Sequence, residues 1–173
     1  MSKGLVIVLT GDGKGKTTSA LGMALRAAGQ GMRVLIIQFI KGGVFYGELA
    51  SLKEVEGIEI KPMGLGMLLG SKEDFEAHRE KAQEAMAEGR RAISSGLYEM
   101  VVLDEILVAL NLGLVEEKEV LELISSRPPH VHLVLTGRGA TEAIVELADT
   151  VTEMVERKHH YRLMKVSVRG IEF

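Results

Sequence analysis

The chain has 173 residues, of which 46% are hydrophobic, so it can form one compact core, and we expect a single domain over residues 1–173. With 21 basic and 24 acidic residues its net charge is -3, which disfavours nucleic acid as a partner because there is no excess of positive charge. Cysteine is absent, which excludes disulfides and thiolate sites. No apolar run approaches the roughly 20 residues that cross a membrane. We therefore expect a cytoplasmic protein without a membrane partner.

Short runs rich in valine, isoleucine and leucine predict five β-strands. They are Leu5 to Thr10, Arg33 to Phe39, Ile58 to Met63, Met100 to Asp104 and Val131 to Thr136. At least three of these runs are apolar at nearly every position, which is typical of parallel strands covered by helices on both faces.

Helix-length segments separate the strands. The longest is expected from Lys72 to about Ser95, because Ser71 and Asp74 have capping-box spacing. Four residues then return at helical spacing as an apolar stripe, namely Phe75, Ala82, Met86 and Ile93. The other expected helices are Thr17 to Ala28, Glu116 to Ser125 and Thr141 to Ala148. The alternation of strand and helix predicts an α/β domain with three layers.

A glycine-rich loop follows the first strand and opens the first helix. It reads Gly11, Asp12, Gly13, Lys14, Gly15, Lys16, Thr17 and Thr18. Its glycines let successive N–H groups turn toward phosphate oxygens, and the helix adds its positive end. Lys16 is expected on the β and γ phosphates, and the Thr17 hydroxyl on Mg²⁺.

The usual pattern of such loops is G-x-x-x-x-G-K-[ST], and here Thr10 replaces its first glycine. A glycine-rich turn with solvated lysines is the alternative. The position between a strand and a helix favours phosphate binding, and with it a three-layer αβα phosphate-loop (RecA-like) fold with a mostly parallel central sheet.

In such sheets ligands bind beyond the carboxyl ends of the strands. Asp104 ends an apolar strand there and is expected to hold Mg²⁺, directly or through water. Glu105 is either a second metal-shell group, a base that activates water, or a carboxylate at a helix start.

Two further cations are expected at the same edge. Arg138 lies in Thr136-Gly137-Arg138-Gly139, and Lys41 in Gln38-Phe39-Ile40-Lys41-Gly42. Each could neutralise phosphate charge or form a surface ion pair, and the position of Arg138 favours phosphate. The histidine pairs His130 with His132 and His159 with His160 are interpreted as structural, since no third metal ligand is identifiable.

Together these motifs resemble the ATP:corrinoid adenosyltransferases of the phosphate-loop type, which act in cobalamin synthesis and salvage. The resemblance covers nearly the whole chain. Besides the loop, its carriers are Gln38 to Gly42, Val101 to Glu105, Thr136 to Gly139, Leu147 to Val151 and Gly170 to Phe173.

The resemblance implies that a corrinoid reduced to Co(I) attacks the ribose 5′ carbon of ATP and expels the whole triphosphate. Lys14, Lys16, Arg138 and Mg²⁺ would then stabilise the leaving group, and Lys16, Glu105 and Arg138 are the expected catalytic residues. Gln38 and Lys41 join the binding residues of the loop. An electron-donating reductase or flavodoxin-like protein is the implied partner, and a homodimer the implied assembly.

The sequence departs from the family in three places. Where members often carry an aromatic pair for the corrin, this chain has Gly64 to Gly70, in which Met67 and Leu69 could make apolar contact; an ordinary packed loop is the alternative. Ile106 to Val108 is apolar where a polar residue is common, and Arg162 to Arg169 loses the usual small and amide residues.

Two other functions share the loop and the acidic strand end. One is an ATPase or regulatory nucleotide-binding switch that hydrolyses at the γ phosphate. The other, a small-molecule kinase, is disfavoured because Arg90-Arg91 is the only adjacent arginine pair that could serve an arginine-rich lid.

Overall fold

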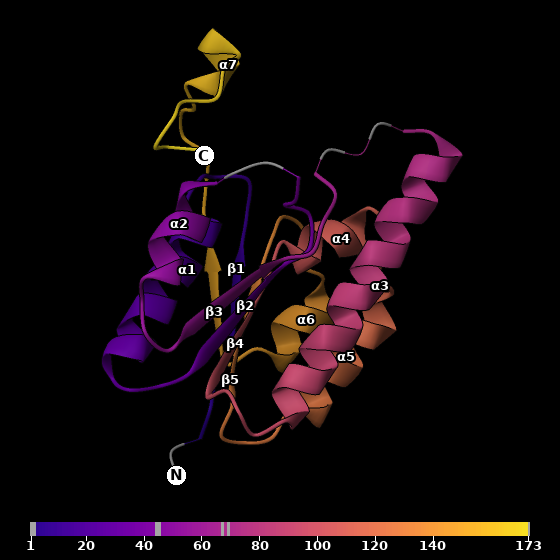
Figure 1. Ribbon diagram of the computed structural model, residues 1–173. Helices are drawn as coiled ribbons and strands as arrows, with labels where there is room; N and C mark the ends of the chain where they lie inside the picture. The colour runs from indigo at the N-terminus through magenta and orange to yellow at the C-terminus, as the bar shows by residue number, and fades with distance from the viewer. Residues whose placement is uncertain (1–2, 44–45, 67, 69, 173) are drawn as a thin grey trace.

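The computed structural model describes residues 3–43, 46–66, 68 and 70–172. Within these ranges a six-stranded sheet has the order β3-β2-β4-β5-β1-β6, and all of its pairings are parallel (Figure 1). The strands are β1 (Val6–Thr10), β2 (Val34–Gln38), β3 (Ile58–Pro62), β4 (Met100–Asp104), β5 (His132–Thr136) and β6 (Thr150–Glu153). The five predicted strands are confirmed, and each end lies within one residue of the expected one.

Helices cover both faces of this sheet (Figure 1). They are α1 (Lys16–Gly29), α2 (Gly47–Lys53), α3 (Lys72–Ser94), α4 (Ile106–Asn111), α5 (Glu117–Ser126), α6 (Glu142–Leu147) and α7 (Tyr161–Met164). The first two lie on one face, α3 to α6 lie on the other, and α7 stands beyond the carboxyl ends of the strands. The predicted three-layer α/β fold is therefore confirmed.

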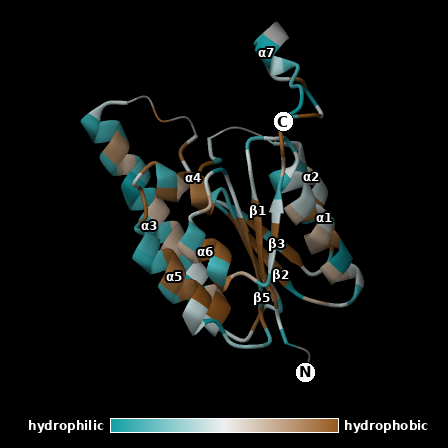
Figure 2. Ribbon diagram, turned by 180° about the vertical axis from the view of Figure 1, so that it is seen from behind, coloured by the Kyte–Doolittle hydropathy of each residue, from teal (hydrophilic) through white to brown (hydrophobic). Residues whose placement is uncertain are grey.

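The core has two parts, one on each face of the sheet. On one face, α1 buries Ala20 and Ala24 against Val34 and Val102 of the sheet. On the other, α3 buries Ala82 and Met86 with Leu103. Figure 2 shows strands coloured mostly as hydrophobic at the centre, surrounded by helices that carry both hydrophilic and hydrophobic residues. In the described ranges no helix combines the length and the apolar character needed to cross a membrane.

The expected helix signals are present in the structure. The Ser71 hydroxyl accepts a hydrogen bond from the N–H of Asp74 (3.1 Å), and the carboxylate of Asp74 accepts one from the N–H of Gly70. Helix α5 begins with a capping box formed by Glu116 and Glu119. The four predicted helices are confirmed to within one residue, whereas α2, α4, α7 and strand β6 were not predicted.

Candidate active site

The phosphate loop joins β1 to α1 and is braced by the chain that follows β6. The N–H of Gly13 donates to the carbonyl of Met154 (2.6 Å), and the N–H of Met154 donates to the carbonyl of Thr10 (2.8 Å). A Cβ atom at Gly13 would lie 2.6 Å from that Met154 oxygen. Gly15, which precedes α1, has a φ of 114°. Glycine is thus required by close approach at Gly13 and by backbone angle at Gly15.

Thr10, the residue that departs from the usual pattern, has a structural contact of its own. Its hydroxyl oxygen accepts a hydrogen bond from the N–H of Ala140 (3.2 Å). The side chain thereby links the phosphate loop to the loop that follows β5, which carries Arg138.

Lys16 is folded into the phosphate loop. Its ammonium donates to the carbonyls of Gly11 (2.6 Å) and Gly13 (2.7 Å). Burial lowers the pKa of Lys16, and the positive charge of Arg138 lowers it further. An anion placed between these two cations would relieve their repulsion.

Asp104 is fully buried at the end of β4 and collects three donors. One carboxylate oxygen accepts from the hydroxyls of Thr17 (2.8 Å) and Thr136 (2.7 Å). The other accepts from the amide of Gln38 (3.2 Å), which the strand register places directly opposite on β2. The phosphate loop, β2, β4 and β5 therefore meet at one carboxylate, as the carboxyl-edge rule predicts.

Glu105 has an unusual backbone and an unusual environment. Its φ of 63° lies in the left-handed region, and its N–H donates to the Thr136 hydroxyl (2.9 Å) just before α4 begins. Burial raises the pKa of its carboxyl to about 7, and the negative charge of Asp104 adds to the increase. Its buried Oε2 has no hydrogen-bond partner among the described residues, and neither has Oε1 of Gln38.

These oxygens provide a test of whether a magnesium ion fits. Mg²⁺ prefers carboxylate, hydroxyl and water oxygens. Thr17, Asp104 and Glu105 offer such oxygens at one place, and a neighbouring cation would stabilise the ionised form of Glu105. The donor set fits the ion.

Lys41 reaches this cluster from the loop after β2. Its ammonium lies 2.8 Å from the carboxylate of Glu48 on α2 and 3.9 Å from that of Asp104. Burial alone would lower the pKa of Lys41, but the charges of Asp104 and Glu48 outweigh it and raise the pKa. Glu48 was missed in the sequence because α2 was not predicted.

Arg138 lies at the outer rim. Its side chain is 65% exposed, and its guanidinium is 3.7 Å from the carboxylate of Asp12. The loop itself is held against α4, where the amide of Asn111 donates to the carbonyl of Arg138 (2.6 Å). The loop and the helix also approach closely, since a Cβ atom at Gly137 would lie 2.7 Å from Cβ of Leu107. Arg138 therefore has a fixed backbone and a side chain free to reach a ligand.

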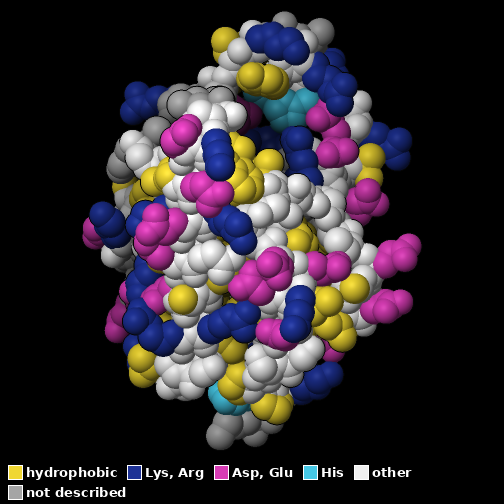
Figure 3. All heavy atoms as spheres, turned by 90° about the vertical axis from the view of Figure 1, so that its right-hand side faces the viewer, with side chains coloured by type: hydrophobic (Ala, Val, Ile, Leu, Met, Phe, Trp, Pro, Cys, Tyr) yellow, Lys and Arg dark blue, Asp and Glu magenta, His cyan; other side chains and the backbone are white. Residues whose placement is uncertain are grey.

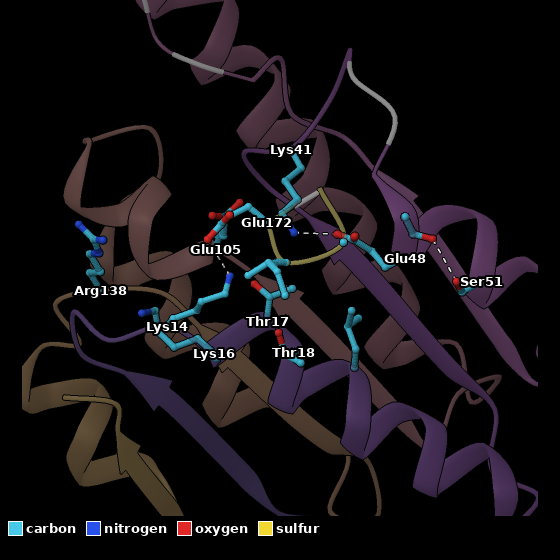
Figure 4. Close-up of a pocket in the computed structure, with 15 residues that line it drawn as sticks. Lys14, Lys16, Thr17, Thr18, Lys41, Glu48, Ser51, Glu105, Arg138 and Glu172 are labelled. Carbon is cyan, nitrogen blue, oxygen red and sulfur yellow. Dashed lines mark hydrogen bonds and ion pairs between the residues drawn. The ribbon is translucent and has the colours of Figure 1, made fainter. Parts of the chain in front are cut away.

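A cavity of about 660 Å³ joins these groups, within the usual size range of small-molecule sites (Figure 4). Of the predicted residues it is lined by Lys14, Gly15, Lys16, Thr17, Thr18, Lys41, Glu105 and Arg138. Asp12 and Gly13 line a smaller adjoining cavity of about 190 Å³, and Gln38 and Asp104 are buried beneath.

The end of the chain forms part of the same wall, which the sequence did not predict. Gly170 to Glu172 line the larger cavity, and His159 lines the smaller one. The sequence signals at these positions were the histidine pair His159 with His160 and the ending Gly170 to Phe173. Ligating atoms of His159, His160 and Glu172 lie within 4.8 Å of one another, but Glu172 already pairs with Lys14 and His160.

The loop expected to meet the corrin begins beside Lys41. The N–H of Gly64 donates to the carbonyl of Lys41 (3.0 Å), and that of Gly66 to the carbonyl of Ile40 (2.8 Å). This start of the loop is packed at the carboxyl edge of the sheet. Met67 and Leu69 lie outside the described residues.

Comparison with known proteins places the chain in a family. The model of the ATP:corrinoid adenosyltransferase family BtuR/CobO/CobP matches residues 2–173. A corrinoid adenosyltransferase of Pseudomonas aeruginosa is 39% identical over 99% of this chain and 84% of its own length. The corrinoid adenosyltransferase CobA of Salmonella typhimurium is 37% identical over 99% of this chain and 86% of its own length.

A solved structure shares the fold at low identity. The KaiC-like protein PH0186 of Pyrococcus horikoshii superposes with a TM-score of 0.58 at 20% identity, covering 92% of this chain and 76% of that one. That likeness concerns the fold alone, whereas the family match and the two relatives extend over nearly all of the sequence. The chain is a member of the ATP:corrinoid adenosyltransferase family.

Proposed function

We propose that this enzyme transfers the 5′-deoxyadenosyl group of ATP to the Co(I) centre of a corrinoid and releases triphosphate. The observation that carries the proposal is the gathering of Lys14, Lys16 and Arg138 around one cavity at a phosphate loop, in a chain of this family. A site built in this way suits a leaving group that carries several negative charges.

The reaction needs little covalent chemistry from the protein. Co(I) supplies both electrons of the new cobalt–carbon bond, the bond between C5′ and oxygen breaks, and its electron pair stays on the departing triphosphate. Cobalt ends as Co(III). Because the metal of the substrate is the nucleophile, the protein contributes positioning and charge stabilisation.

In this proposal Lys16 exchanges the carbonyls of Gly11 and Gly13 for phosphate oxygens, which also accept from the N–H groups of the loop. Thr17 and Asp104 would hold Mg²⁺, with Glu105 beside them. The ion would supply positive charge to the phosphate oxygens. Arg138 swings from Asp12 to the triphosphate, and Lys14 binds at the outer side.

Hydrolysis of ATP at the γ phosphate is the second candidate, and one observation favours it. A general base works best when its pKa is near the working pH, and the pKa of Glu105 is raised to about 7. In the first proposal the same carboxylate would be a metal-shell group, whose ionised form a bound cation would stabilise.

One assay separates the two candidates. The protein is incubated with MgATP and a chemically reduced corrinoid, cobalt–carbon bond formation is followed by absorbance, and the phosphate product is identified. We expect an adenosylated corrinoid and inorganic triphosphate in equal amounts. Orthophosphate formed at the same rate without corrinoid would support hydrolysis instead.

Further expectations from the resemblance belong to the same proposal. They are corrin contact by the loop of Met67 and Leu69, an electron-donating reductase or flavodoxin-like partner, a homodimer and a cytoplasmic location. Binding of the corrin at this loop is supported by its start, which packs against the loop of Lys41 at the carboxyl edge.

A further inference from the structure

The C-terminal segment returns to the phosphate loop and brings a carboxylate with it. After β6 the chain passes through α7, beyond the carboxyl ends of the strands (Figure 1). In the space-filling view this segment stands over the body of the protein, with histidine and basic side chains at the junction (Figure 3). The last described residues, Gly170 to Glu172, line the cavity at the phosphate loop.

Glu172 is held at Lys14 by several contacts. One carboxylate oxygen lies 3.5 Å from Nζ of Lys14 and 3.2 Å from Nε2 of His160. The other accepts a hydrogen bond from the N–H of Val168 (2.6 Å). That hydrogen bond lowers the pKa of Glu172, and the charges of Lys14 and His160 lower it further, so the group is an anion at neutral pH.

A carboxylate at this place has the charge and the oxygen atoms of a phosphate group. Lys14 belongs to the loop that the triphosphate is proposed to occupy, and the cavity exposes it beside Lys16 and Arg138. Lys14 cannot pair closely with Glu172 and with a phosphate oxygen in one geometry without bringing the two anions together. Like charges at such a distance repel.

We propose that Glu172 competes with the triphosphate for Lys14: it occupies the lysine in the free enzyme, yields it to ATP, and takes it back when the triphosphate leaves. This inference rests on the proposed function, because it concerns the product of that reaction.

The contacts of Glu172 make the exchange reversible. When Lys14 turns to phosphate, the carboxylate keeps the hydrogen bond from the N–H of Val168 and stays 3.2 Å from Nε2 of His160, with which it pairs when that ring is protonated. The same contacts keep it near the lysine, ready to return. A product with several negative charges dissociates slowly from a phosphate loop. An internal anion that takes over one of its cations favours dissociation of the product.

Binding of inorganic tripolyphosphate with Mg²⁺, measured by calorimetry, tests the competition without any corrinoid. We expect Glu172→Gln to tighten binding roughly two- to fivefold, the effect of one partly exposed ion pair. Glu146→Gln, at an exposed position on α6, makes the same change of net charge and should leave the affinity unchanged. Thermal unfolding checks that each variant is folded.

A double-mutant cycle identifies Lys14 as the contested group. In a Lys14→Met background, Glu172→Gln should no longer change the affinity. An unchanged or weaker affinity of Glu172→Gln in the wild-type background would overturn the inference, and so would an equal gain in both backgrounds. If the unmodified protein bound no tripolyphosphate, the proposed function itself would fail, which is a different result.

Discussion

Lys16 is the residue on which we expect phosphate binding to depend most. Its ammonium donates hydrogen bonds to two backbone carbonyls of the phosphate loop. The side chain makes these contacts within the loop and is not part of the hydrophobic core. Removing the side chain should therefore affect the ligand far more than the fold.

We predict that Lys16→Ala lowers turnover by roughly 10²- to 10³-fold, the usual loss for one electrostatic group at a developing charge. Steady-state assays with MgATP and reduced corrinoid measure the loss, and thermal unfolding should show an unchanged midpoint. Lys118→Ala, at an 81% exposed position on α5, is the matched control. Turnover of Lys16→Ala close to that of the control would show that the loop has been misinterpreted.

At the scale of elements, the loop that carries Arg138 depends on the end of α4. The amide of Asn111 donates to the carbonyls of Arg138 (2.6 Å) and Gly139 (3.3 Å). We predict that Asn111→Leu, which removes both donors at similar size, weakens tripolyphosphate binding by a factor of roughly two to five, since a net hydrogen bond contributes about 1 kcal/mol.

Calorimetry measures the affinity for tripolyphosphate of Asn111→Leu and of Arg138→Ala. We expect Arg138→Ala to lose more affinity, because it removes the guanidinium itself, whereas Asn111→Leu removes only the hydrogen bonds that support its loop. Leu112→Ala, at the next and also exposed position, is the control. Wild-type affinity in Asn111→Leu would mean that the loop keeps its position without α4.

Asp149 joins the turn between α6 and β6 to β1. Its contacts should make the stability of the fold depend on pH. Its carboxylate accepts from the N–H of Val6 (2.8 Å) and from Lys3 (3.1 Å), and these contacts lower its pKa below 3.8, the hydrogen bond from Val6 most strongly. Because the folded-state pKa is depressed, the stabilisation is complete above pH 3.8 and is lost as the pH falls through the folded-state value.

We therefore expect Asp149→Asn to unfold at a lower temperature than the wild type at pH 7. The difference between the two unfolding temperatures should shrink progressively below pH 3.8. Thermal unfolding of both proteins along a pH series measures the gap. A gap of constant size at all pH values would mean that charge plays no part in the contact.

The elements that could be predicted from the sequence are those with a local signal. Strands β2 and β4 are buried at every position and read as continuous apolar runs, and α3 carries both a cap and an apolar stripe. Strand β6 is exposed at all four positions, so it lacks that signal and exists because its backbone pairs with β1. The short helix α4 begins directly after Glu105, in line with one of the three interpretations of that residue, but no pattern in the sequence indicated the positive φ of Glu105 or the extent of the helix.

At the scale of the whole molecule, the parallel sheet explains which part of the site was predictable. Gln38, Asp104 and Thr136 come from three strands, yet they meet because the carboxyl ends of parallel strands share one edge. The contact of Glu172 with Lys14 depends instead on the path of the chain after β6, which no periodicity or motif determines.

The topology also explains why the phosphate loop can be open and yet well placed. Strand β1 lies between β5 and β6, so the loop that follows it is linked to Ala140 on one side and to Met154 on the other. The loop is thus positioned by the Thr10 hydroxyl and by its own backbone, which in the proposed function leaves Lys14 and Lys16 to exchange protein partners for phosphate.

The position of bond cleavage in ATP tests the central claim most directly. ATP labelled with oxygen-18 in the bridge between C5′ and the α phosphorus is converted with reduced corrinoid, and the products are analysed by mass spectrometry. Attack at the ribose carbon predicts that all of the label leaves in the inorganic triphosphate. Label retained in ADP, accompanied by orthophosphate, would contradict the claim, because it would place the reaction at the γ phosphate.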